Sequence, residues 1–162
     1  MGRAHDGARP RKDNRVNPRF GWPLFAALLA LSVFAATAAA PPQTVSIRLE
    51  DPSTDSSITH MRISLDRETV KAGRVTLQAV NTSKSLVHEV LVVADTTKPL
   101  PIDAKQERVN EKRIHSLGEI SDLQPGKSGK LTLNLRAGTY LLFCNEPGHF
   151  RDGMQAKLTV AP

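Results

Sequence analysis

The chain has 162 residues and a formal net charge of +6, and its length is typical of a single domain. The charge is unevenly placed, because six Arg and Lys residues oppose two Asp residues in positions 1–20 and the next twenty positions are uncharged. Positions 41–162 hold 16 basic and 14 acidic residues, scattered along the chain. Because the Lys and Arg residues after position 40 are scattered and not gathered on one stretch with aromatic residues between them, we expect no nucleic-acid partner.

Residues 1–40 have the pattern of a leader. The basic start is followed by an uncharged apolar run, LFAALLALSVFAATAAA, at positions 24–40, which ends in small residues before Pro41 and Pro42. This order is typical of a secretory signal peptide, and an uncleaved helical anchor over residues 20–40 is the alternative. Either interpretation predicts that a domain at residues 41–162 is exported, to the periplasm or to the outer face of the cytoplasmic membrane.

Cys144 is the only cysteine, so the chain cannot form an internal disulfide. A lone thiol is vulnerable to oxidation in an oxidising compartment unless it is buried or bound. This predicts a protected position for Cys144.

Alternating apolar and polar residues recur through residues 41–162, as in TVSIRLE and MRISL, and favour short half-buried strands. Gly and Pro separate the runs. We therefore predict an all-β fold, an antiparallel β-sandwich of about eight strands after the apolar leader helix. The expected strands are 44–50, 60–66, 74–80, 86–94, 115–120, 130–135, 139–144 and 154–160.

Residues 95–112 interrupt this rhythm, because the segment is charged, contains Pro99 and Pro101 and shows no sustained period. We expect a long surface excursion here, with one helical turn around residues 103–109.

Cys144, His149 and Met154 stand five residues apart in the stretch YLLFCNEPGHFRDGM. Taken singly, each has an ordinary explanation: a buried thiol, an exposed turn histidine and a methionine that fills a gap in the core. Together, at the end of two neighbouring strands, they supply three of the donors of a His₂Cys-plus-Met site, which selects copper. A second histidine has to come from elsewhere.

Four other histidines are present, and His5 lies in the leader. His88 opens the apolar run HEVLVV after a turn-rich loop, so we expect it to complete the site at a strand end. His115 is the second choice, and His60 shows no partner spacing.

These residues resemble the cupredoxins of the plastocyanin/azurin type, the small blue copper proteins. The pattern runs from Asn81 and His88 through Gly138-Thr139-Tyr140 to Cys144, Pro147-Gly148-His149 and Gly153-Met154. The C-x4-H-x4-M spacing is similar to that of auracyanin and rusticyanin. The sequence patterns around His88 and from Cys144 to Met154 are also similar to those of exported cupredoxin-like copper-binding proteins. The resemblance implies a Greek-key sandwich, one copper ion bound by His88, Cys144, His149 and Met154, and an electron exit at the ring of His149.

Glu89 departs from this family pattern, because many members have asparagine after the first histidine. The hydrogen bond that asparagine makes across the site then needs another donor, for which Asn81 and Asn145 are candidates.

The expected function is that of a type 1 copper protein that carries single electrons in the cell envelope, and copper carriage, buffering or delivery is the alternative. Zinc is disfavoured because methionine is a poor zinc ligand. A Cys-His nucleophile is disfavoured because no third, orienting residue is evident. We therefore expect no enzyme but a monomer that meets a redox partner or a copper donor or acceptor protein, with a membrane tether through residues 20–40 where the leader is retained.

Overall fold

The computed structural model describes residues 43–162, and the expected leader lies outside them. This part of the chain is all-β apart from one short 3-10 helix. No helix within it is long and apolar enough to cross a membrane. Its elements are, in chain order, β1 Gln43–Glu50, β2 Arg62–Leu65, β3 Thr69–Lys71, β4 Gly73–Asn81, β5 His88–Ala94, β6 Ile102–Asp103, β7 Arg108–Val109, η1 Glu111–Arg113, β8 Ser116–Leu123, β9 Ser128–Leu135, β10 Gly138–Phe143 and β11 Gln155–Ala161.

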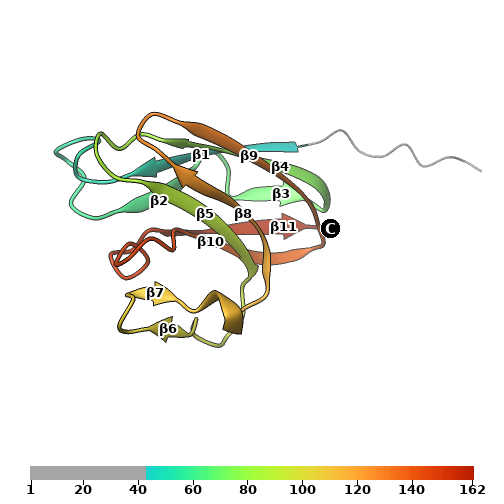
Figure 1. Cartoon of the computed structure of the whole chain (residues 1–162). Helices are drawn as coiled ribbons and strands as arrows, with labels where there is room; N and C mark the ends of the chain where they lie inside the picture. The colour runs from blue at the N-terminus through green and yellow to red at the C-terminus, as the bar shows by residue number, and fades with distance from the viewer. Residues whose placement is uncertain (1–42) are drawn as a thin grey trace, which may run out of the picture. The chain divides into compact units, whose positions relative to one another are not determined.

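Two sheets form a sandwich, which confirms the predicted fold class (Figure 1). One sheet has the strand order β2-β1-β4-β9 and the other β3-β11-β10-β5-β8. All eight predicted strands are present with slightly shifted bounds, and β3, β6 and β7 were not predicted. The sheets are mixed, since β1 runs parallel to β4 and β3 parallel to β11. Between β2 and β4 the chain crosses to the second sheet, where it forms β3, and then returns to the first sheet. This crossover allows β1 and β4 to run parallel as neighbours.

The main core lies between the two sheets and is built from alternate residues of each strand. In β1, the buried positions Val45, Ile47 and Leu49 alternate with exposed Ser46 and Arg48, as the sequence period requires. Burial of such apolar surface stabilises the fold by about 25 cal/mol per Å².

A second, smaller cluster covers the outer face of the sheet that contains β5 and β10. Leu91 and Val93 point into this cluster, whereas Val90 and Val92 point into the main core. The covering side chains come from residues 100–114, whose hairpin lies beside this sheet in Figure 1. Both faces of β5 are therefore buried, which explains its unbroken apolar sequence.

The predicted helical turn around residues 103–109 is wrong. This segment is a β-hairpin in which Ile102 pairs with Val109 and Asp103 with Arg108. The Asp103 carboxylate accepts the backbone N–H of Lys105 at 2.9 Å, which stabilises a turn instead of a helix. The strand geometry places Val109 in the outer cluster, where it is 3% exposed.

Candidate metal centre

Three candidate ligands meet at one end of the sandwich, because their strands are neighbours. His88 is the first residue of β5, Cys144 directly follows β10, and His149 lies in the loop between β10 and β11. The antiparallel pairing of β5 and β10 places Leu91 opposite Phe143, which brings His88 and Cys144 to the same end. The loop is closed by backbone hydrogen bonds from Cys144 N–H to Met154 O at 3.1 Å and from Met154 N–H to His149 O at 3.0 Å.

The donor atoms of these side chains converge. The Nδ1 atoms of His88 and His149 are 3.2 Å apart, and Cys144 Sγ lies 3.9 Å and 3.4 Å from them, respectively. Within residues 43–162 this is the one group of three such side chains close enough to hold a metal ion. His88 and Cys144 have no exposed surface, whereas His149 keeps 8%. A thiol and two imidazole nitrogens, without a carboxylate among them, match the soft donor set that copper prefers.

Met154 is fully buried and belongs to the same core cluster as Cys144. Its backbone is hydrogen-bonded to both Cys144 and His149, which places the Met154 backbone next to these two residues. His60 and His115 are exposed and lie outside the cluster, and His60 contacts Asp152 with Nδ1 at 3.3 Å from Oδ1. The structure brings His88, and neither of these two histidines, to Cys144 and His149.

An irregularity in the sheet sets the position of His88. In the β5–β8 pairing, His88 faces Leu123 and Val90 faces Ile120, so β8 has one additional residue between these positions. Asp122, in that stretch of β8, has a φ of 49°. Bulges of this kind redirect side chains next to functional sites.

Burial controls the protonation of the donors. It raises the pKa of the Cys144 thiol from 9.0 to about 12, and it lowers the pKa of His88 below its ordinary value against the opposing effect of Asp51. Burial and the neighbouring His88 lower the pKa of His149 to about 4. Both imidazoles are thus neutral near pH 7 and have lone pairs available, whereas the thiol must lose its proton to bind a metal.

Asp51 contacts the site and was not predicted from the sequence. Its Oδ2 lies 3.1 Å from His88 Nε2, and the residue has no exposed surface. Burial acts to raise the pKa of Asp51, but hydrogen bonds from Ser53, Ser83 and His88 outweigh it and lower the pKa to about 2. In the sequence, Asp51 stands before Pro52 at the end of a strand, which is typical of an ordinary turn residue.

Glu89 itself makes the link across the site for which the sequence suggested Asn81 or Asn145. Its Oε1 accepts the backbone N–H of Asn145 at 3.1 Å, and its own N–H points to Cys144 Sγ at 3.4 Å. The Asn81 amide instead donates to Leu86 O at 2.8 Å and braces the loop before His88. Burial, together with the charges of Glu146 and Glu111, raises the pKa of Glu89 to about 7.

The β6–β7 hairpin clamps the loop that carries the ligands. The Asn145 amide accepts the Val109 N–H at 2.6 Å and donates to Val109 O at 3.0 Å and to Glu111 Oε1 at 2.7 Å. Gly148 N–H donates to Glu107 O at 3.0 Å. The surface excursion at residues 95–112 therefore helps to hold the loop that carries the candidate ligands in place.

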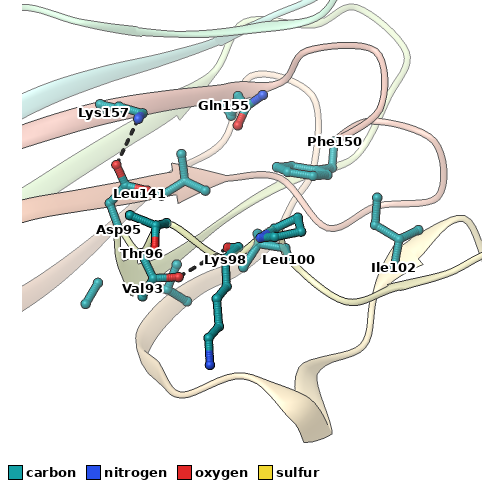
Figure 2. Close-up of a pocket in the computed structure, with 13 residues that line it drawn as sticks. Val93, Asp95, Thr96, Lys98, Leu100, Ile102, Leu141, Phe150, Gln155 and Lys157 are labelled. Carbon is teal, nitrogen blue, oxygen red and sulfur yellow. Dashed lines mark hydrogen bonds and ion pairs between the residues drawn. The ribbon is translucent and has the colours of Figure 1, made fainter.

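An apolar groove lies between residues 94–102 and the outer face of the sheet that contains β5, β10 and β11 (Figure 2). Leu100, Leu141 and Phe150 line it, and Lys157 bridges to Asp95 at 2.8 Å at its edge. Phe150 packs edge-on against Phe143 in the outer cluster, so this pair lies apart from the core cluster that contains Cys144. None of the three donor side chains lines the groove.

A buried Cys-His-His cluster at the end of a β-sandwich, with methionine beside it, defines a small copper-binding protein of the cupredoxin class. Residues 51–161 match the family model of copper binding proteins of the plastocyanin/azurin family. The chain belongs to this family, and its cofactor is one copper ion.

Individual relatives agree with this assignment. Auracyanin-B of Chloroflexus aurantiacus is 43% identical over 49 residues, which cover 30% of this chain and 21% of that protein. The copper-resistant cuproprotein CopI of Pseudomonas aeruginosa is 49% identical over 41 residues, which cover 25% of this chain and 23% of that protein. These alignments span less than a quarter of each relative.

Solved structures show the same fold. Reduced auracyanin from Roseiflexus castenholzii matches with a TM-score of 0.52 and 22% identity, over 77% of this chain and 100% of that one. Rusticyanin from Thiobacillus ferrooxidans matches with a TM-score of 0.56 and 16% identity, over 75% and 79% of the two chains.

Proposed function

We propose that this chain is a type 1 copper protein that carries single electrons in the cell envelope, with His88, Cys144, His149 and Met154 as the copper ligands. The observation that carries the proposal is the convergence of three buried donor atoms within 4.8 Å of one another. Copper bound there would supply one-electron chemistry between Cu(I) and Cu(II). The two oxidation states prefer different coordination geometries, and a trigonal His₂Cys site with a weak thioether is a compromise between them.

The surroundings of the donors suit electron transfer. His88 and Cys144 lie at the ends of paired strands, and the loop with His149 is fixed from both sides by hydrogen bonds, so little has to rearrange when the charge changes. The Glu89 N–H near Cys144 Sγ stabilises a thiolate there. His149 is the only one of these three donors with any exposed surface, 8% of the residue, so we assign the electron route to His149.

We assign no enzymatic activity to the site. Four protein ligands leave no position for a substrate, and the donors are buried. Export to the periplasm, a monomeric state and a redox partner protein belong to the same proposal, supported by the leader pattern and the family. Light scattering of the purified exported domain tests the monomer, and a dimer at micromolar concentration contradicts it.

The absorption spectrum tests the copper assignment. Copper-free protein given Cu(II) should develop an intense visible band from sulfur-to-copper charge transfer, with one equivalent of copper at saturation. Cys144→Ser should lose this band and keep its β-sheet circular dichroism, because the strands do not depend on the thiol. A wild-type protein that stays colourless and takes up zinc stoichiometrically contradicts the proposal.

Copper carriage is a second candidate, favoured by the likeness to a copper-resistant cuproprotein over 41 residues. The same ligands serve both functions, so the test is kinetic. Rapid reduction and reoxidation by a redox protein with copper retained supports the electron carrier. Transfer of copper to a copper-free acceptor protein, with slow electron exchange, supports the carriage function instead.

A further inference from the structure

Asp51 is a fully buried carboxylate in contact with a proposed copper ligand. It directly follows β1, and the exposed side-chain fractions of Asp51 and His88 are 1% and 0%. Its Oδ2 lies 3.1 Å from His88 Nε2, while its Oδ1 accepts the Ser53 backbone N–H at 2.7 Å. The turn after β1 thus holds the carboxylate in one orientation toward the imidazole.

This contact fixes which nitrogen of His88 carries the proton. A carboxylate only accepts hydrogen bonds, so Nε2 must be the protonated nitrogen of the neutral ring. The lone pair is then on Nδ1, the atom that faces His149 Nδ1 at 3.2 Å and Cys144 Sγ at 3.9 Å. The opposite tautomer would place a proton where the metal has to bind.

We propose that Asp51 is a positioning residue of the copper centre, which holds His88 in the Nε2–H tautomer and, through its negative charge, favours Cu(II) over Cu(I). The inference rests on the proposed function for its ligand assignment. Its physical basis is general, since a carboxylate bound to the second nitrogen of a ligating histidine fixes the ring and raises its basicity.

Asp51→Asn is the informative substitution because it keeps the size of the side chain. The asparagine oxygen can still accept the Ser53 N–H, which leaves the NH₂ group to face His88 Nε2. An N–H donor at that place favours a lone pair on Nε2 and moves the ring proton to Nδ1. We expect copper affinity to fall by about 10- to 100-fold, the usual effect of losing such a partner.

Asp55→Asn is the matched control. Asp55 accepts the Ser57 backbone N–H at 2.8 Å, so it makes the same type of turn four residues further on. It is exposed and contacts none of the donors, so this variant should keep the wild-type affinity, tautomer and reduction potential.

The experiment combines three measurements on the full exported domain. Nitrogen-15 chemical shifts of the copper-free protein, with His88 assigned through His88→Ala, report the tautomer. Chelator competition reports copper affinity, and voltammetry of the copper-loaded protein reports the potential. We expect Nε2–H in the wild type, and Nδ1–H, weaker copper binding and a higher potential in Asp51→Asn.

A wild-type His88 protonated on Nδ1 overturns the inference, and so does an Asp51→Asn protein with the tautomer, affinity and potential of Asp55→Asn. The wild-type tautomer is measured without the Asp51→Asn protein, so the inference stays falsifiable even where Asp51→Asn does not fold. This measurement is also made without copper. Failure of the wild type to bind copper would therefore refute the proposed function without deciding the role of Asp51.

Discussion

The protonated thiol of Cys144 makes copper binding a proton-releasing reaction, and the number of protons is predictable. Burial raises its pKa from 9.0 to about 12, so the copper-free protein holds a thiol throughout the neutral range. Both imidazoles are already neutral there, because burial lowers the pKa of His149 to about 4 and that of His88 below its ordinary value. Binding near pH 8 should therefore release about one proton per copper ion, from Cys144.

The structure also gives the size of the effect. A rise in pKa from 9.0 to about 12 corresponds to about 4 kcal/mol that favours the thiol over the thiolate in the empty site. The apparent copper affinity should increase about tenfold for each pH unit, and this increase should continue above pH 9, where an ordinary thiol would already be ionised.

Calorimetry in two buffers of different ionisation enthalpy counts the released protons, with oxygen excluded so that the thiol stays reduced. The thiolate ultraviolet absorbance of copper-free protein, taken as the difference from Cys144→Ser, locates the pKa directly and removes the contribution of Tyr140. A midpoint near pH 9 would refute the reasoning, because it would mean that burial does not raise the pKa of the thiol. Copper binding without proton release near pH 8 would also refute it, because the thiol would then be ionised already or would not bind the metal.

Three further outcomes test the site. His88→Ala should weaken copper binding by more than about 100-fold and abolish the charge-transfer band, because a ligand matters more than an outer partner, whereas His115→Ala should leave both unchanged in a chelator-competition titration. Met154→Gln should keep the colour and lower the reduction potential, and Met154→Leu should raise it; equal potentials in voltammetry would make Met154 a packing residue. Burial and the charge of Glu146 raise the pKa of Glu89 from 4.5 to about 7, so the folded protein keeps a proton that the unfolded chain loses. The free energy of unfolding of copper-free protein should therefore fall by about 3 kcal/mol between about pH 4.5 and 7 relative to Glu89→Gln, and parallel denaturation curves at both pH values would contradict this.

The strands, and the side chains that meet at the end of the sandwich, were predictable because both depend on local pattern. Alternation in β1 needs only one buried face, and the even spacing of Cys144, His149 and Met154 needs only one loop. The position of His88 at a strand end could also be predicted, because the sequence shows an apolar run that begins after a turn-rich loop.

The supporting residues were not predictable in the same way, because their roles arise from contacts across long sequence separations. Asp51 lies 37 residues before His88, and nothing in the turn after β1 indicates that a histidine will lie against it. The sequence predicts a helical turn around residues 103–109 in place of the hairpin, because the apolar residues of this segment are too few to show a period. Val109 becomes buried only against the neighbouring sheet.

Because Asn145 is hydrogen-bonded to Val109 and Glu111, the ligand loop of the copper site depends on a segment that is distant in the sequence. Residues 144–154 look like a cassette that could be moved between proteins, yet their second residue is held by three side-chain hydrogen bonds to Val109 and Glu111. At about 1 kcal/mol each, a host sandwich without this hairpin would give up about 3 kcal/mol of support for the transplanted loop. A graft that reproduces the native spectrum would therefore need residues 100–114 as a second, separate insert.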